Sequence, residues 1–250
     1  MKTLSKKAKP VNKSNYINHK LNKKMNRIIL SITLIALFLI FGCGKKQDVT
    51  NQKQEQTSDQ NNQKSVEQQK KEDSLKAITD QQEKEKKVKE ALEEEKILND
   101  TSGQWAINAE ASSTYGDHTG KDTWTPSQMT GKPDVENYGD NGKAWTSNEA
   151  DKGLEWVQLT FEKAVNAFEV RVRQTFNPGA IIKVELVDEK GKNHTVFEGV
   201  DKTKYEQDKI QYFIAKFDKT DYKTKTVKIT LATNSVPGWN EIDAVQLVGN

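Results

Sequence analysis

The distribution of hydrophobic residues divides the chain into three parts. Residues 28–41 form an apolar run whose polar members are Ser31 and Thr33. Residues 45–98 are mostly polar, and their scattered apolar residues keep no sustained period. From residue 104 onward, apolar and polar residues alternate in short segments, which is typical of half-buried β-strands. We therefore expect a hydrophobic leader, a polar linker and a C-terminal all-β domain.

The alternation in the C-terminal part predicts several short strands joined by turns. Pro178 and Pro237 are each followed by glycine, a pair that fits the two central positions of a type II turn. Residues 109–147 are rich in Gly, Asp, Ser and Thr and should form long surface loops. We expect an antiparallel jelly-roll β-sandwich over residues 102–250. The alternating segments are 157–161, 168–173, 182–186, 213–217, 227–231 and 245–247.

The apolar run is about 21 Å long as a helix, too short for a hydrocarbon core of about 30 Å and typical of a signal peptide. It follows Arg27 and ends in Ile-Phe-Gly-Cys, which resembles a bacterial lipobox. The resemblance implies that residues 1–42 are a lipoprotein signal peptide and that the thiol of Cys43 carries lipid such as palmitate. Met25 is an alternative translation start. The other interpretation is a short membrane anchor or buried helix in which Cys43 has no role.

Lipid on Cys43 would hold the mature protein at a membrane, since buried acyl chain contributes about 0.8 kcal/mol per methylene. We expect a bacterial cell membrane or outer membrane location, facing the periplasm or the exterior. Cys43 is the single cysteine, which excludes an internal disulfide. Residues 1–44 carry 9 basic and no acidic side chains, which leaves 30 basic and 36 acidic side chains elsewhere. Nucleic acid is therefore not an expected partner.

The polar part predicts a disordered tether over residues 43–65 and a charged, helix-forming linker over 66–101. Leu75 and Ile78 have the a/d spacing of a coiled coil, but the next heptad places polar residues in the seam. Three interpretations of residues 66–98 stay open. They are a single charged helix or partly disordered spacer, weak self-association, and a docking helix.

Seven motifs stand in order in the C-terminal part. They are Ala111–Tyr115, Thr130–Val135, Tyr138–Asp140, Ala144–Trp145, Glu155–Phe161, Gln174–Ala180 and Gly238–Gly249. Together they resemble the galactose-binding-like, discoidin (coagulation factor 5/8 type C) superfamily. The resemblance implies an eight-stranded jelly roll whose loops at one end bind sugars, phospholipid head groups or proteins. Because the flanking cysteine pair of the coagulation-factor pattern is missing, the core must supply the stability.

Aromatic residues in the loops are the candidate ligand contacts, since sugar sites combine aromatic faces with a few hydrogen-bonding groups. The candidates are Trp124, Trp239, Phe176 and Tyr138. Phe176 and Trp239 each neighbour a Pro-Gly turn, which would present them at the same end of the sandwich. Tyr115 is a further loop aromatic, and Trp145 and Trp156 are expected to have structural roles. The alternative for the whole set is that these rings plug the ends of the sandwich.

Polar candidates accompany the aromatic residues. Arg173 precedes an Asn-Pro-Gly turn and could hydrogen-bond sugar hydroxyls, although a solvated strand face explains it equally well. His118 is a candidate hydrogen-bonding group in a loop, with plain surface exposure as the alternative. The resemblance also implies a structural calcium, for which Asp140 and Asp243 are the candidate ligands. Their alternative role is hydrogen bonding to backbone amides.

Motifs for catalysis are missing from the sequence, including Gly-x-Ser-x-Gly, His-Glu-x-x-His and a phosphate-cradling glycine loop. We therefore expect a protein that is not an enzyme. The favoured function is non-catalytic binding of a carbohydrate by a membrane-anchored lipoprotein. A protein- or cell-surface-binding adhesion module is the first alternative, and an assembly protein that acts through its stalk is the second.

Overall fold

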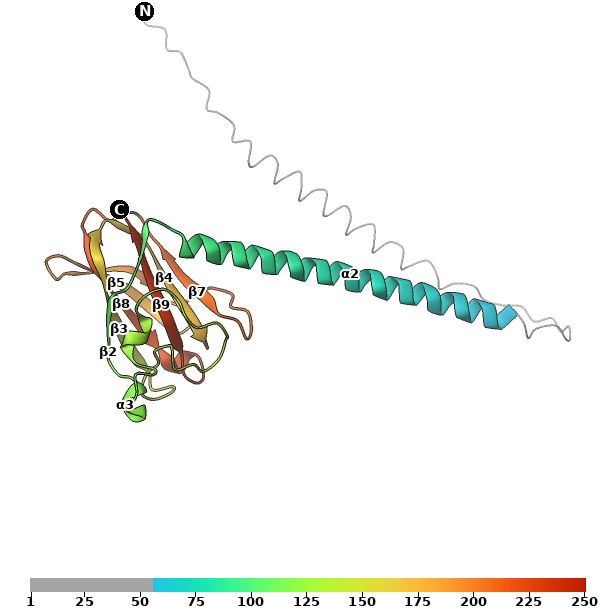
Figure 1. The fold of residues 1–250 in the computed structure, drawn as a ribbon, viewed down its shortest axis with the longest axis horizontal. Helices are drawn as coiled ribbons and strands as arrows, with labels where there is room; N and C mark the ends of the chain where they lie inside the picture. The colour runs from blue at the N-terminus through green and yellow to red at the C-terminus, as the bar shows by residue number, and fades with distance from the viewer. Residues whose placement is uncertain (1–55) are drawn as a thin grey trace, which may run out of the picture. The chain divides into compact units, whose positions relative to one another are not determined.

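The computed structural model describes residues 56–250, with side chains from residue 67 onward except that of Thr119. The predicted signal peptide, Cys43 and residues 43–55 of the predicted tether lie outside the described residues. The chain divides into two compact units, residues 1–73 and 74–250. Helix α2 (Gln56–Leu98) begins in the first unit and continues into the second (Figure 1).

Nine strands of the second unit form two antiparallel sheets. The first sheet has the order β1-β9-β4-β7, and the second has the order β2-β3-β8-β5-β6. The strands are β1 (Gly103–Trp105), β2 (Asn108–Ala111), β3 (Leu154–Val165), β4 (Ala167–Phe176), β5 (Ile181–Asp188), β6 (Asn193–Glu198), β7 (Gln211–Lys216), β8 (Thr224–Ala232) and β9 (Glu241–Gly249). Short helical turns lie at α3 (Gly116–Thr119), η1 (Pro126–Met129) and η2 (Thr233–Ser235).

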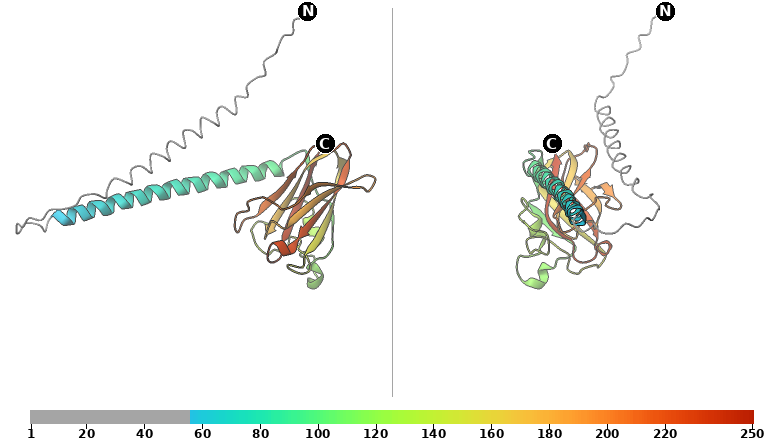
Figure 2. Two further views of the ribbon diagram at one scale, coloured as in Figure 1. Left: turned by 180° about the vertical axis from the view of Figure 1, so that it is seen from behind. Right: turned by 90° about the vertical axis from the view of Figure 1, so that its right-hand side faces the viewer.

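The two sheets pack face to face as the layers of a sandwich (Figure 2), with the hydrophobic core between them. Alternate residues of β3 fill this core, because successive side chains of a strand point to opposite faces. Val157, Leu159 and Phe161 are fully buried there, opposite β4 residues such as Val170 and Val172. The predicted antiparallel jelly-roll β-sandwich is confirmed.

Strand β9 is buried along its whole length, which the alternation at residues 245–247 did not predict. One face of β9 enters the core, and its other face lies beneath polar groups from distant segments. Gln246 donates a hydrogen bond to the carbonyl of Ile97 at the end of α2 and accepts one from Arg171. Glu241 and Asp243 of the same strand are also almost fully buried. Two buried carboxylates therefore lie in the last strand.

Helix α2 starts at Gln56, ten residues before the expected helical segment, and ends at Leu98 as expected. Residues 56–98 contain neither glycine nor proline, so nothing in the sequence ends the helix earlier. Ion pairs at i,i+4 spacing, such as Lys87–Glu83 at 2.8 Å, support its exposed surface. Among the described residues, no helix combines the length and the hydrophobicity that crossing a membrane requires.

The last turns of α2 dock on the β1-β9-β4-β7 sheet. Within residues 74–250, Glu90 pairs with Lys209 at 3.0 Å, and Glu94 accepts a hydrogen bond of 3.1 Å from the hydroxyl of Tyr212 in β7. Lys86, one turn earlier, pairs with Glu206 at 2.5 Å. Residues four apart share one face of a helix, so a polar stripe makes this contact. Of the three interpretations left open above, docking describes these turns.

Candidate ligand-binding site

One end of the sandwich, which we call the loop end, is formed where β4 ends, β9 begins and the β2–β3 loop lies. Strand β4 ends at Phe176, which lies opposite Glu241, the first residue of β9. The loop from β2 to β3 reaches the same region and contains α3, which lies at the end of the sandwich opposite to the C-terminus (Figures 1 and 2). Segments far apart in the sequence therefore meet at this end, on a rigid two-sheet scaffold.

Three aromatic rings meet there around a cavity of about 110 Å³. The ring of Tyr115 is in contact with both tryptophans, edge to face, with centroids 5.5 Å from Trp124 and 5.6 Å from Trp239. Asp140 and Thr146 complete the lining. We call these five residues the aromatic pocket. Edge-to-face packing leaves ring surface free for a ligand, and Trp239 is 38% exposed.

Trp124 is held in an unusual backbone conformation. Its φ of +55° lies in the left-handed region, which a bulky side chain seldom adopts. Its backbone N–H donates to the carbonyl of Gly142 at 2.9 Å, and its carbonyl accepts from the hydroxyl of Thr114 at 2.6 Å. Its indole N–H donates to Oδ1 of Asp140 at 2.9 Å. These bonds offset the strain and fix the ring at the pocket wall.

Trp239 is held from the opposite side by the turn that precedes β9. Its carbonyl accepts a hydrogen bond of 2.9 Å from the side-chain amide of Asn177. Gly238 has a φ of +88°, and its N–H donates to Asp151 at 2.9 Å. A side chain at position 238 would approach the Asn177 amide to 3.0 Å, so glycine suits both the conformation and the space. The predicted Pro-Gly turn therefore does position this tryptophan.

Asp140 carries the negative charge of the aromatic pocket. Behind it lies Glu241, whose pKa is raised to about 8 by burial and by the adjacent carboxylate of Asp140. The backbone N–H of Asn141 donates to both oxygens of Glu241, at 3.2 and 3.3 Å. At neutral pH, Glu241 is therefore mostly protonated and hydrogen-bonded to Asp140. Glu241 therefore holds the Asp140 side chain by a hydrogen bond without adding a second negative charge.

Other predicted contacts lie beside the aromatic pocket rather than in it. The ring of His118 is 5.5 Å from that of Tyr115, and His118 is hydrogen-bonded to Asn148. Tyr138 and Phe176 pack edge to face at 5.6 Å. Both connect to Trp239 through Asn177, which follows Phe176 in the chain. Trp145 is fully buried in the core, as the sequence indicated.

Arg173 is the predicted contact that the structure does not bring to the aromatic pocket. Its Nη1 lies 2.5 Å from Asp243 and 2.8 Å from the carbonyl of Val135, and its Nε lies 3.4 Å from Glu94. Its side chain is 11% exposed. The alternative of a solvated arginine is wrong, because α2 docks over this strand face and supplies Glu94. A sugar contact by Arg173 stays a prediction.

The predicted calcium ligands are also separated. Burial raises the pKa of Asp243, and the guanidinium of Arg173 beside it counteracts this effect. Asp140 is instead engaged by Trp124 and Glu241, while nearby Asp134 pairs with Lys143 at 3.3 Å. Among the described residues, no group of three or more Asp, Glu, His or Cys side chains could hold a metal. Asp140 and Asp243 therefore have different partners and do not share a calcium ion as a pair of ligands.

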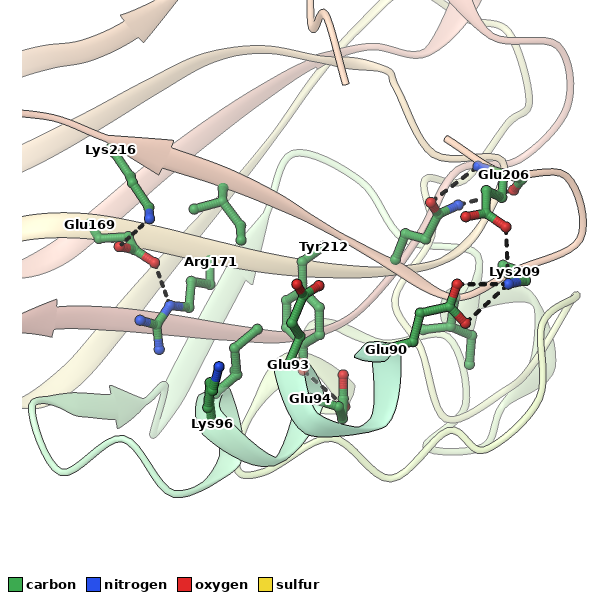
Figure 3. A pocket seen from close by; sticks show the side chains of 14 residues that line it. Glu90, Glu93, Glu94, Lys96, Glu169, Arg171, Glu206, Lys209, Tyr212 and Lys216 are labelled. Atoms are coloured by element: carbon green, nitrogen blue, oxygen red, sulfur yellow. Dashed lines mark hydrogen bonds and ion pairs between the residues drawn. The ribbon is translucent and has the colours of Figure 1, made fainter. Parts of the chain in front are cut away.

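A larger cavity, of about 460 Å³, lies between the end of α2 and strands β4 and β7 (Figure 3). Charged side chains line it in pairs, including Glu90 with Lys209 and Glu169 with Arg171 at 2.5 Å. Lys216 also approaches Glu169, at 3.7 Å. Acidic and basic side chains thus form ion pairs with each other where the helix contacts the sheet. We interpret this space as part of the docking interface.

Two of the five residues that line the aromatic pocket are predicted from the sequence as ligand contacts, and three are not. Trp124 and Trp239 were selected because they flank turns or lie in loops. Tyr115 was noted as a loop aromatic but not selected, and Asp140 was selected for calcium. Thr146 was not predicted as a contact, and its hydroxyl donates to the carbonyl of Asn240 at 3.0 Å.

The fold and the pocket define a β-sandwich module with an aromatic cavity at its loop end. Residues 94–250 match the model of the family described as pappalysin-1, SD scarf domain, C-terminal, and the chain belongs to this family. The match includes the last turn of α2. The finer relation to the discoidin superfamily stays a prediction. No curated protein matches the sequence of the chain.

Solved structures with similar folds have low sequence identity. One is a chitosan-binding module of a chitosanase/glucanase from Paenibacillus sp. IK-5, with 14% identity, a TM-score of 0.42, and coverage of 58% of this chain and 97% of that chain. Another is the lectin domain of lectinolysin complexed with Lewis B antigen, with 14% identity, a TM-score of 0.41, and coverage of 58% and 94%. A third comes from the complex of reduced XRCC1 with the DNA pol beta catalytic domain, with 12% identity, a TM-score of 0.43, and coverage of 59% and 99%. Likenesses this distant do not identify a ligand for this chain.

Proposed function

We propose that the chain binds a carbohydrate without catalysis, through the aromatic pocket. The observation that carries this proposal is the meeting of Tyr115 and Trp124, from the β2–β3 loop, with Trp239, from the turn before β9, around one cavity. Sugar rings present apolar C–H faces that pack on aromatic rings, together with hydroxyl groups that need polar partners. Asp140 supplies such a partner in the same cavity.

The arrangement of Asp140 and of Glu241 behind it favours binding over cleavage. Glycoside hydrolysis uses two carboxyl groups on either side of the scissile bond, about 5 to 9.5 Å apart. Asp140 and Glu241 instead hydrogen-bond to each other, and Glu241 is almost fully buried. A sugar bound in the pocket would meet one carboxylate of this pair.

The second part of the proposal is attachment to a membrane through lipid on Cys43. It is supported by the apolar run at residues 28–41 and the lipobox-like sequence that ends it. Such attachment would place the sugar-binding module at a bacterial surface or in the periplasm, at the end of a charged helix.

A glycan array probed with the purified full chain tests the sugar-binding proposal. Trp124→Ala and Trp239→Ala should each lose binding to the glycans that the unchanged protein retains. Trp156→Ala is a matched control, because Trp156 is a partly exposed tryptophan outside the pocket, covered by Lys228 at 4.7 Å. An array with no binding, together with retained binding to whole cells or to a protein, would support the adhesion alternative instead.

A further inference from the structure

The aromatic pocket carries a negative charge, and this charge limits which ligands it can bind. Among its five lining residues, Asp140 is the charged one, and no basic side chain is among them. The indole N–H of Trp124 holds Oδ1 of Asp140 at 2.9 Å. The carboxylate is thus fixed in place at a wall of the cavity, next to the space a ligand would fill.

The groups around Asp140 are arranged to keep its charge in the pocket. Lys143, three residues further along the chain, pairs with Asp134 at 3.3 Å. Glu241 behind it is mostly neutral at pH 7, so it donates to Asp140 rather than repelling it. Trp124 and Glu241, which both hydrogen-bond to the Asp140 side chain, are thus largely uncharged at pH 7.

The aromatic rings complement that charge. The faces of tryptophan and tyrosine carry negative potential, and they attract a cation that approaches within about 6 Å. Trp124, Tyr115 and Trp239 surround the same cavity as the carboxylate. A ligand with one positive group would gain a charge-assisted hydrogen bond to Asp140 and cation–π contacts with the rings.

We infer that the carbohydrate bound in the aromatic pocket carries a protonated amine, as an amino sugar with a free amino group does, and that Asp140 is the residue that selects it. This inference rests on the proposed sugar binding at the same pocket. A neutral N-acetylated sugar can still pack on the rings but cannot form an ion pair with Asp140. A sugar acid is repelled by the carboxylate.

The test is calorimetric titration of the full chain with two probes that share one backbone. These are a β-1,4-linked glucosamine tetramer and its fully N-acetylated counterpart. We expect the amine form to bind at least tenfold more tightly, because a charge-assisted hydrogen bond is lost in the other form. Asp140→Asn should reduce this preference to less than about threefold, chiefly by weakening the binding of the amine tetramer.

Asp117→Asn is the matched control. Asp117 lies in α3 beside the loop end, is exposed, and does not line the pocket, so this variant removes the same charge nearby and should keep the preference. Equal affinity for both tetramers, or a preference that survives in Asp140→Asn, overturns the role of Asp140. Binding of other, neutral glycans but not of the amine tetramer overturns the inference while the proposed function stands. If no glycan of any kind binds, the proposed function fails and the inference fails with it.

Discussion

Trp124 donates its indole N–H to Asp140 across 2.9 Å, which joins one of the two indole rings of the pocket to its charged residue. The two residues lie sixteen positions apart in one long loop, and the hydrogen bond closes that loop over the cavity. Neither residue can move far without disturbing the other. The geometry of the pocket therefore depends on this contact as well as on the sandwich beneath it.

The first prediction concerns that hydrogen bond. Trp124→Phe keeps an aromatic wall but removes the N–H donor, so Asp140 loses its fixed position. We expect glycan affinity to fall by about threefold to tenfold, since a hydrogen bond to a charged group contributes about 1.5 kcal/mol or less when partly exposed. Trp124→Ala should cost more, because it also removes the ring. Titration calorimetry of the two variants measures the difference, and equal losses would show that the N–H has no role.

The second prediction separates tryptophans of the site from those of the core. Trp239 is 38% exposed, so Trp239→Ala should change the free energy of unfolding by about 1 kcal/mol or less while abolishing glycan binding. Trp145 is 0% exposed, so Trp145→Ala should cost about 3 to 5 kcal/mol. Urea denaturation with tryptophan fluorescence measures both. A large loss of stability in Trp239→Ala would mean that this ring plugs the sandwich instead of binding a ligand.

The third prediction tests the placement of Arg173. Arg173→Met leaves Asp243 buried without its cation, which should cost about 3 kcal/mol or more in the free energy of unfolding. The double variant Arg173→Met/Asp243→Asn should be more stable than the single one, since no unpaired buried charge remains. Glycan affinity should not change in folded protein at low temperature. A loss of affinity without a loss of stability would restore Arg173 as a ligand contact.

The fourth prediction is a pH dependence. The pKa of Glu241 is raised to about 8 in the folded state, above the value of 4.5 for an unperturbed glutamate. Between these values the folded protein holds a proton that the unfolded chain releases, so stability falls as the pH rises. The slope approaches about 1.4 kcal/mol per pH unit in the middle of this range. Glu241→Gln should show a flatter profile from pH 5 to pH 8, measured by urea denaturation at each pH. An unchanged slope in Glu241→Gln would contradict the raised pKa.

The fifth prediction concerns the leader. Bacterial cells that express the chain and are fed an alkyne fatty-acid analogue should yield labelled protein in the membrane fraction. Cys43→Ser should remove the label, because the thiol is the attachment point. Labelling that survives in Cys43→Ser, or a soluble and unlabelled protein, would exclude lipidation at this residue.

The sandwich could be predicted because its signals are local. Alternation at 157–161 and 227–231 gives the buried face of each strand directly, and the structure confirms both as core. The position of Trp239 at the loop end could be predicted for a similar reason, because the neighbouring Pro-Gly pair indicates a turn. Hydrophobic periodicity and turn chemistry act within a few residues and need no knowledge of distant partners.

The docking of α2 and the fate of Arg173 could not be predicted in this way. Glu94 reaches Arg173 through a polar stripe that shows no hydrophobic period, and the two residues are far apart in the chain. The same stripe places Glu90 against Lys209. Charge pairs of this kind depend on tertiary placement, so the sequence favoured a spacer and left self-association and docking open.

Sugar binding at the aromatic pocket is the central claim, and an NMR spectrum of the tryptophan indole N–H groups tests it most directly. The chain has five tryptophans, and each gives one indole N–H signal in an ¹⁵N-labelled sample. On titration with a glycan that binds, the signals of Trp124 and Trp239 should shift together, while those of Trp105, Trp145 and Trp156 should stay in place. Shifts confined to Trp105 or Trp156, with Trp124 and Trp239 unmoved, would contradict the account.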